Sequence, residues 1–204
     1  MYKFPIIVFE GIEGSGKSFH LKNIKKYFKK KKIKFLSLRE PGGSKNAEKI
    51  RKLILNKKSN FNKNTDLLLY LASRSENIHQ IKKYYKKKII LIDRFTDSTI
   101  AYQHYGLGVD LSLIKMINKH LLGNIKSNFT FLNIVNKKNM IKRLKLRKKL
   151  NRYDKFEYNF YIKVQNGFLS IAKKNKKSYQ IIDSNKNIEL NKKLISKTIN
   201  GLIQ

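Results

Sequence analysis

The chain has 204 residues and a mass of 24.1 kDa, a length that suits one domain with a sizeable core. It has no cysteine, and its apolar runs stay well short of a membrane span, so disulfide frameworks, thiolate chemistry and transmembrane helices are excluded. Strand-like sequence begins within a few residues of Met1, which leaves no room for a signal peptide and predicts a cytoplasmic protein without a membrane partner.

The net charge is +34, because 47 Lys and Arg residues face only 13 Asp and Glu residues. A basic surface can bind the phosphate backbone of nucleic acids, but frequent Lys, Asn and Ile are also typical of AT-rich coding sequence. Only seven of the 47 cations are Arg, whereas a dedicated nucleic-acid groove usually combines Arg with aromatic residues. We therefore favour composition bias, and predict no specific nucleic-acid partner and only weak, non-specific binding at low salt.

The first predicted element is a short buried strand, since residues 6–9 are apolar and β-favouring. The next eight residues, 11–18, read Gly-Ile-Glu-Gly-Ser-Gly-Lys-Ser and fit the pattern G-x-x-x-x-G-K-[ST] without a gap. An amphipathic helix begins after Lys17 and places Leu21, Ile24 and Phe28 on one face. A glycine-rich loop between a strand and a helix predicts a site for nucleotide phosphates.

The residue types of this loop match what a bound phosphate requires. Glycines lack the Cβ atom that would keep backbone N–H donors away from the phosphate, and the helix start adds positive charge. Lys17 can reach the β- and γ-phosphates, and the Ser18 hydroxyl can hold Mg²⁺. The nucleotide-binding residues predicted here are Gly11, Ile12, Glu13, Gly14, Ser15, Gly16, Lys17 and Ser18.

The remaining chain alternates short apolar runs with amphipathic segments. Further strands are predicted at residues 33–38, 89–92, 129–135 and 179–182. Helices are predicted from Ser44 to about Leu55, from Thr65 or Asp66 past Ile81, and at 97–105, 111–122, 137–147, 155–174 and 188–203. Strands separated by helices predict an α/β fold with a five-stranded parallel sheet, covered by helices on both faces, in a single domain. The ligand then belongs at the carboxyl ends of the strands.

Charged residues follow several of these predicted strands. Asp93 ends the apolar run 89–92, the layout of a Walker B carboxylate that holds Mg²⁺ directly or through water. In a chain this rich in Lys, the few Arg residues suggest bidentate phosphate binding, and Arg39 and Arg94 at strand ends can hold an acceptor phosphate. Arg51 sits within a Lys-rich helix and is discounted, and His20 is expected on the surface of the first helix.

The segment at about 147–155 is basic and carries Arg147 and Arg152, so it is predicted to be a short lid that closes over the phosphoryl donor. The spacing of residues indicates no Ser/His/Asp or Cys/His catalytic set. A general base is also unnecessary if the acceptor is an ionised phosphate.

At this point the chain resembles thymidylate kinase, the P-loop enzyme that phosphorylates dTMP with ATP. The resemblance spans nearly the whole chain and includes FEGIEGSGKS, LREPGGS at 38–44, LYLASR at 69–74, IDRFTDSTIAYQ at 92–103 and RKKLNRYD at 147–154. The Glu at position 13 and the arginines of the lid resemble the bacterial subtype. The resemblance implies a P-loop NTPase three-layer sandwich, with ATP and Mg²⁺ as cofactors, dTMP as substrate and a homodimer formed through sheet-covering helices.

The resemblance also assigns roles to the substrate-binding residues. Glu13 would contact the sugar 3′-hydroxyl or help to order the metal with Ser18 and Asp93. Arg39 and Arg94 would hold the dTMP phosphate, and Tyr102 would pack against the deoxyribose. Thymine would stack on Tyr70, and its edge would be read by Arg74 and Gln103, with help from Ser98 or Thr99. Arg143 would contact ATP, and the catalytic residues would be Lys17, Arg94, Arg147 and Arg152.

The chain departs from the family pattern at several positions. Asn133 stands where an Asp is usual, Leu107 where an Arg is common, and Tyr70 where a Phe is usual. Lys148, Lys149 and Asn151 replace the usual lid residues. Three alternatives stay open: a kinase for dUMP, dCMP or a deoxynucleoside, a nucleic-acid-binding protein with a vestigial phosphate loop, and a structural protein with an inactive site.

Overall fold

The computed structural model describes residues 3–147 and 150–203. Within these residues, no helix is long and apolar enough to cross a lipid bilayer. The elements, in chain order, are β1 (Ile6–Glu10), α1 (Lys17–Lys30), β2 (Phe35–Arg39), α2 (Lys45–Leu55), α3 (Lys63–Tyr84), β3 (Ile89–Asp93), α4 (Thr96–Thr99), the π-helix η1 (Ile100–Gly106), α5 (Leu111–Leu122), β4 (Phe129–Ile134), α6 (Lys137–Lys145), the 3₁₀-helix η2 (Arg152–Lys155), α7 (Tyr158–Lys174), the 3₁₀-helix η3 (Lys176–Ser178), β5 (Tyr179–Asp183) and α8 (Ile188–Ile203).

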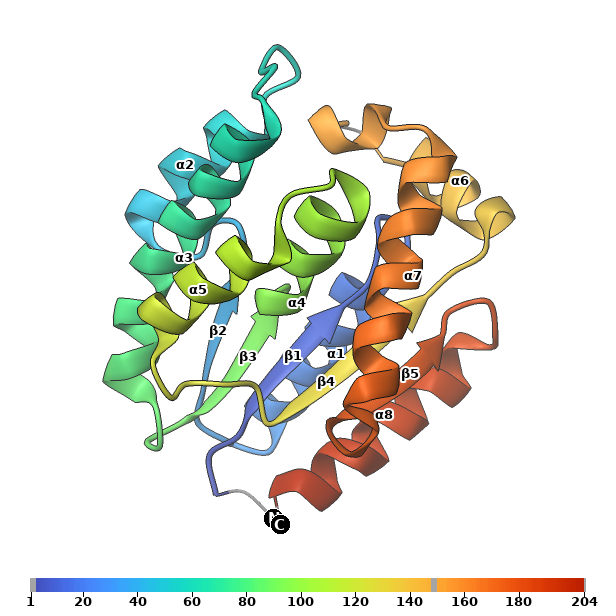
Figure 1. The fold of residues 1–204 in the computed structure, drawn as a ribbon. Helices are drawn as coiled ribbons and strands as arrows, with labels where there is room; N and C mark the ends of the chain where they lie inside the picture. The colour runs from blue at the N-terminus through green and yellow to red at the C-terminus, as the bar shows by residue number, and fades with distance from the viewer. Residues whose placement is uncertain (1–2, 148–149, 204) are drawn as a thin grey trace.

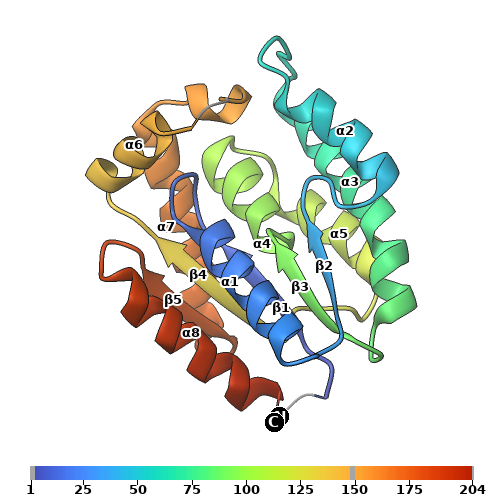
Figure 2. The same ribbon diagram turned by 180° about the vertical axis from the view of Figure 1, so that it is seen from behind.

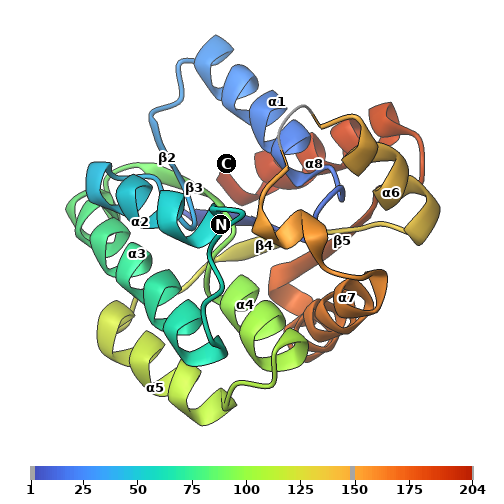
Figure 3. The same cartoon turned by 90° about the horizontal axis from the view of Figure 1, so that it is seen from above.

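The five strands form one parallel sheet in the order β2-β3-β1-β4-β5, which confirms the predicted α/β fold. Helices α1 and α8 cover one face (Figure 2). Helices α3, α5 and α7 cover the other face, together with α4 and η1 (Figure 1). Because all strands run the same way, their carboxyl ends meet at one edge of the sheet. Figure 3 views this end of the molecule, with α2 and α3 on one side and α6 and α7 on the other.

The alternation of side chains along β1 builds the two halves of the core. Ile7 and Phe9 face α1 and α8 and pack in one cluster with Phe28, whereas Ile6 and Val8 belong to the cluster beneath α3. These four strand residues are at most 1% exposed. Since both faces of the strand are buried, the strand reads as a continuous apolar run. This packing fixes the position of the loop that follows β1.

The predicted helix boundaries need correction at three places. The long helix α3 begins at Lys63 rather than Thr65 or Asp66, because the Asn62 side chain accepts hydrogen bonds from the amides of Asn64 and Thr65 at 3.0 and 2.9 Å. The helix predicted from residue 155 begins at Tyr158, after the separate 3₁₀-helix η2, which is capped by Asn151. Helix α6 ends at Lys145, two residues earlier than predicted.

The helix predicted at 97–105 is also more complex than an α-helix. Four residues of α4 lead into the π-helix η1, in which the amide of Leu107 donates to the carbonyl oxygen of Tyr102 at 3.0 Å. A π-helix carries more residues per turn than an α-helix and often occurs at functional sites. Here it buries two adjacent side chains, Tyr102 and Gln103, beside the carboxyl ends of the strands.

Candidate active site

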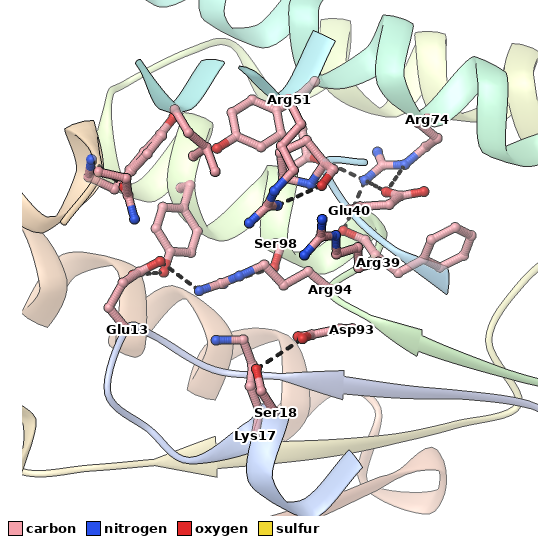
Figure 4. Close-up of a pocket in the computed structure, with 18 of the residues that line it drawn as sticks. Glu13, Lys17, Ser18, Arg39, Glu40, Arg51, Arg74, Asp93, Arg94 and Ser98 are labelled. Carbon is pink, nitrogen blue, oxygen red and sulfur yellow. Dashed lines mark hydrogen bonds and ion pairs between the residues drawn. The ribbon is translucent and has the colours of Figure 1, made fainter. Parts of the chain in front are cut away.

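A cavity of about 210 Å³ opens at the carboxyl ends of β1, β2 and β3. It lies between the phosphate loop, α3, the segment that follows β3 and the lid (Figure 4). The side chains that line it and were predicted as site residues are Glu13, Lys17, Ser18, Arg39, Tyr70, Arg74, Asp93, Arg94, Ser98, Thr99, Tyr102, Gln103 and Arg147. The fold therefore brings residues separated by more than 100 positions into one cavity.

The phosphate loop connects β1 to the N-terminus of α1. Gly11 has φ +140°, and a Cβ atom there would lie 2.3 Å from the carbonyl oxygen of Asn133, so only glycine fits. In the part of the chain that the structure describes, no side chain caps α1, whose N-cap residue is Gly16. The first amides of α1 are thus available to an anion, in the manner of a phosphate-binding helix N-terminus.

Lys17 is buried at the bottom of the cavity, with 7% of its surface exposed. Its ammonium lies 3.4 Å from the carbonyl oxygen of Ile12. Burial, together with the nearby Arg94 charge, lowers the pKa of Lys17 to about 8, although Asp93 and Glu13 oppose this effect. A buried ammonium with few partners is ready to bind a negatively charged phosphate, which would in turn raise its pKa.

Ser18 and Asp93, two of the three residues predicted to hold or order Mg²⁺, are joined by a hydrogen bond. The Ser18 hydroxyl donates to Oδ2 of Asp93 at 3.0 Å, and Oδ1 of Asp93 is buried without a hydrogen-bond partner among the described residues. An unsatisfied carboxylate oxygen beside a hydroxyl is the kind of oxygen donor that Mg²⁺ prefers. The two residues therefore fit the metal that the sequence predicts at this position.

A partly buried ion pair joins the phosphate loop to the end of β3. Arg94 donates to Glu13 at 2.8 Å and to Ser98 at 3.3 Å, and the Tyr102 hydroxyl donates to the second oxygen of Glu13. Burial by itself would raise the pKa of Glu13, but Arg94 and Lys17 outweigh it and hold this pKa below its usual range. Glu13 is therefore ionised, and it orients Arg94 toward the cavity (Figure 4).

Arg74, on α3, lines the cavity and is almost completely buried, with 1% of its surface exposed. Its guanidinium donates to Glu40 and Asn118 at 2.8 and 2.7 Å. It also donates to the carbonyl oxygen of Phe95 and to Thr99, both at 2.9 Å. These bonds use four of the five N–H donors of the group and leave one at Nη1 for a ligand.

Asp66 organises a second buried cluster, which connects α3 to η1 and η2. It accepts hydrogen bonds from the Tyr153 hydroxyl at 2.6 Å, from Gln103 at 3.5 Å and from Arg152. Oε1 of Gln103 is buried without a partner among the described residues. Tyr70 meets the Tyr153 ring edge-to-face, with 6.1 Å between centroids. The cluster presents an amide and an aromatic ring to the cavity.

Comparison with known proteins gives a consistent result. A family model for thymidylate kinase matches residues 9–195. The chain belongs to the thymidylate kinase family. It is 38% identical over 185 residues to the thymidylate kinase of Thermosipho africanus, which covers 90% of this chain and 91% of that protein. It is also 38% identical over 188 residues to that of Mycoplasma capricolum, covering 90% and 88%. The crystal structure of thymidylate kinase from Ehrlichia chaffeensis matches with a TM-score of 0.78 and 30% identity, over 98% of this chain and 100% of that one.

Residues 148 and 149 of the predicted lid lie outside the described residues of this thymidylate kinase family member. The structure describes the lid residues before and after them. Arg147 lines the cavity and pairs with Asp154 at 2.6 Å. Arg152 does not line it: the guanidinium pairs with Asp66, and its Nε is buried without a described partner. The structure thus brings one of the two predicted lid arginines to the cavity.

A second cavity of about 250 Å³ lies beside the start of α1. Arg143 lines it and donates to the carbonyl oxygens of Gly14 and Ser184 at 2.9 and 2.6 Å. The expectation that His20 is on the surface is wrong, because its helix face meets α8 and only 3% of the residue is exposed. Burial, together with the charges of Lys192 and Arg143, lowers the pKa of His20 to about 4, so the imidazole is neutral.

Arg51 was discounted from the sequence as a phosphate-binding residue, yet the fold places it at the main cavity. It donates to the carbonyl oxygen of Pro41 at 2.6 Å. Arg39, which was predicted, forms a two-point ion pair with Glu48 at 2.8 and 3.0 Å and keeps about half of its side chain exposed. Applied without exception, the rule that scarce Arg residues are candidates for phosphate binding would have included Arg51 among the cavity residues.

Glu10 is a supporting residue that the sequence did not reveal. It is completely buried, and one carboxylate oxygen accepts from the amides of Phe95 and Ser98 at 2.7 and 3.2 Å. The other oxygen accepts from the Ser98 hydroxyl at 2.5 Å. These bonds hold the segment that carries Arg94, whose φ of +67° is unusual for a residue with a side chain. Burial raises the pKa of Glu10 to about 8, and the nearby Asp97 charge contributes.

Glu10 should make the stability of the protein depend on pH. Its pKa is about 8 in the folded protein and 4.5 without these contacts, so the folded state binds the proton more tightly. The contribution to the free energy of unfolding is complete below about pH 4.5 and is lost as pH rises toward 8, by up to about 1.4 kcal/mol per pH unit. Glu10→Gln should abolish this loss in urea titrations from pH 5 to 8.5. The exposed Glu76→Gln should retain it, and a slope unchanged in Glu10→Gln would show that another group is responsible.

Proposed function

We propose that this protein transfers the γ-phosphoryl group of ATP to dTMP and forms dTDP, with Mg²⁺ bound at Ser18 and Asp93. The observation that supports this proposal best is the charge around the main cavity. Six of the nine charged side chains that line it are cationic, and they come from both sides. Lys17 lies on the donor side, whereas Arg39, Arg51 and Arg94 lie on the side of β2, α2 and β3. Two phosphate groups can therefore face each other there.

The acceptor side is suited to a pyrimidine deoxynucleotide. Arg94 and Arg51 can hold its phosphate, with the bidentate geometry that a guanidinium offers. Tyr102, bonded to Glu13, presents a ring against the sugar. The unpaired Oε1 of Gln103 fits the N3–H donor of thymine, and the free Nη1 hydrogen of Arg74 is available to a carbonyl oxygen of the base.

The donor side is suited to ATP. The phosphate loop and Lys17 would bind the β- and γ-phosphates, and the cavity beside Arg143 would hold the base. Arg147 lies where it can approach the transferred phosphoryl group, and Arg152 would join it if the lid moved away from Asp66. Their role would be to stabilise charge that develops in the transition state.

The chemistry asks mainly for positioning and positive charge. The acceptor phosphate of dTMP is already ionised, so no side chain has to remove a proton from it. Glu13 and Ser98 fix Arg94, and Glu10 fixes the backbone that carries it. Mg²⁺ would supply neutralisation of the phosphate oxygens when bound. Lys17 would balance negative charge between donor and acceptor.

We also propose a homodimer formed through the helices that cover the sheet. Leu68 on α3 and Met116 on α5 are 57% and 62% exposed, and these two helices pack side by side. Large apolar side chains exposed on neighbouring helices support such an interface.

A coupled assay of ADP release, with ATP and Mg²⁺, tests the substrate. The acceptors are dTMP, dUMP, dCMP, dGMP, UMP and thymidine, and turnover should be fastest with dTMP. Gln103→Ala should lower kcat/KM for dTMP about 10–100-fold, because it removes a buried hydrogen bond to the base. Tyr105→Phe is the matched control on η1: it removes only the hydroxyl that bonds Ser170 at 3.3 Å and should change little. Preferred turnover of another acceptor would refute the dTMP assignment.

A further inference from the structure

The connections from helices to strands gather at the edge of the sheet opposite the active site. All strands are parallel, so the segments 29–34, 82–88, 119–126 and 173–178 lead to the amino ends of β2, β3, β4 and β5. Figure 1 shows them at the lower end of the molecule. We refer to these four segments as the basic pole.

Lysine is concentrated in the basic pole far beyond its general frequency. The chain has 47 Lys and Arg residues, of which seven are Arg, so about a fifth of its 204 residues are Lys. Lys makes up 18 of the 54 exposed residues in the rest of the described chain but 15 of the 19 exposed residues of the pole, whose 27 residues include sixteen Lys in all. All except Lys88 are exposed. The bias that explains the overall charge therefore does not explain this cluster.

Acidic residues are segregated from the pole. Its four segments contain no Asp or Glu. Apart from Glu76 in the middle of α3, the acidic residues follow the carboxyl ends of strands or lie at the starts of helices and in the lid. The ion pairs among residues 3–147 and 150–203 all lie outside the pole. Within the described chain, its ammonium groups thus have no carboxylate to neutralise them.

Helix dipoles account for only part of the cluster. Seven of the sixteen lysines are in the last turns of α1, α3, α5 and α7, where a cation gains about 0.3–1 kcal/mol from the helix C-terminus. The other nine lie beyond the helix ends, where this effect fades. Lysines crowded there repel one another, and an anionic partner would relieve this repulsion.

In one segment of the pole, 82–88, two tyrosine rings lie among the lysines. The ammonium of Lys88 lies 4.5 Å from the centre of the Tyr84 ring, and that of Lys86 lies 5.5 Å from the Tyr85 ring. Both tyrosines are partly exposed. Cations alternating with aromatic rings are typical of surfaces that follow a phosphate backbone and accept bases.

We propose that the basic pole binds the phosphodiester backbone of nucleic acid, without sequence preference, while the active site at the opposite end stays free. A polymer is the fitting partner because the charge extends over four connections, which one small anion cannot span. The proposal differs from composition bias in one respect: binding should depend on where the lysines are, rather than on the net charge.

Two variants of equal net charge test this distinction. Lys30, Lys34, Lys87 and Lys177 are exposed positions of the pole, and all four are changed to Gln in the pole variant. Lys52, Lys57, Lys58 and Lys138 are exposed positions outside it, and all four are changed to Gln in the control variant. The probe is a fluorescein-labelled 20-base-pair duplex of mixed sequence, followed by anisotropy at 50–200 mM salt.

The pole variant should bind the duplex at least about tenfold more weakly than the control, with a salt slope reduced by about one for each lysine that no longer meets a phosphate. The control should stay within about twofold of the original protein. Saturating duplex should leave dTMP kinase activity unchanged. Equal losses in both variants, absence of binding at 50 mM salt, or competition of the duplex with ATP would each overturn the proposal. Tighter binding to phosphatidylglycerol vesicles at equal phosphate concentration would overturn nucleic acid as the partner.

Discussion

Replacing Lys17 by Met is expected to lower kcat for dTMP phosphorylation by about 10²–10³-fold, the usual loss when one preorganised charged donor is removed. The chain should fold as well as before, because the change replaces a costly buried ammonium with an apolar side chain of similar length. Steady-state kinetics and thermal unfolding measure the two effects. Lys22→Met is the matched control, since Lys22 is exposed on the same helix and should keep kcat within about twofold.

The pH dependence gives an independent test of Lys17. Because burial lowers its pKa to about 8 in the free protein, the ammonium is lost above that pH. The value of kcat/KM for ATP should therefore be constant below about pH 8 and fall above it. Bound phosphate raises the pKa, so kcat should fall only at higher pH. A full kcat in Lys17→Met would show that the phosphate loop does not hold the donor.

Replacing Arg94 by Lys is expected to lower kcat/KM for dTMP by about 10²-fold. Arg94 hydrogen-bonds Glu13 and Ser98 while its guanidinium also faces the cavity. The single ammonium of Lys cannot bond Glu13, Ser98 and a phosphate in the cavity at the same time. Lys retains the positive charge and tolerates the φ of +67° about as well as Arg does. The loss would therefore come from geometry, and titration of initial rates with dTMP measures it.

A double variant separates binding from stability. A weakened bond to the partly buried Glu13 should also destabilise the fold. Adding Glu13→Gln to Arg94→Lys should restore part of the melting temperature while kcat/KM stays low. Arg39→Lys is the control, because Arg39 is half-exposed and its pair with Glu48 is a surface ion pair, worth at most about 1 kcal/mol. If catalysis recovered together with stability in the double variant, Arg94 would have a structural role only.

Local patterns in the sequence were sufficient for several features of the site. The eight-residue motif at 11–18 predicted the loop between β1 and α1, and the apolar run before Asp93 predicted the strand that ends there. Asp93 and Ser18 are 75 positions apart, yet they lie at 3.0 Å because parallel strands bring their carboxyl ends to one edge. That rule needs only the order of strands and helices, which hydrophobic periodicity reveals.

Other features depended on contacts that no local pattern contains. Whether His20 faces solvent depends on α8, which begins 168 positions later. Whether Arg51 reaches the cavity depends on the path of the loop at Pro41, whose carbonyl oxygen it bonds. In the sequence, Glu10 only follows an apolar strand. Its role in holding the segment after β3 arises from hydrogen bonds with the amides of Phe95 and Ser98. The sequence predicts one regular helix at 97–105, where the structure has α4 and the π-helix η1, because periodicity does not register a change of helix type over a few residues.

The sequence by itself determined the fold class, the glycine-rich loop and the family, and it predicted the metal site, because each of these depends on neighbouring residues or on the order of elements. The tertiary structure decided which side chains support the site. It paired Glu13 with Arg94, gave Arg74 four internal hydrogen bonds and kept Arg152 on Asp66 rather than in the cavity. It also gathered sixteen lysines at one end of the sheet. Whether a side chain is buried, and which group it bonds, depends on segments that are distant in the sequence and come into contact only in the folded protein.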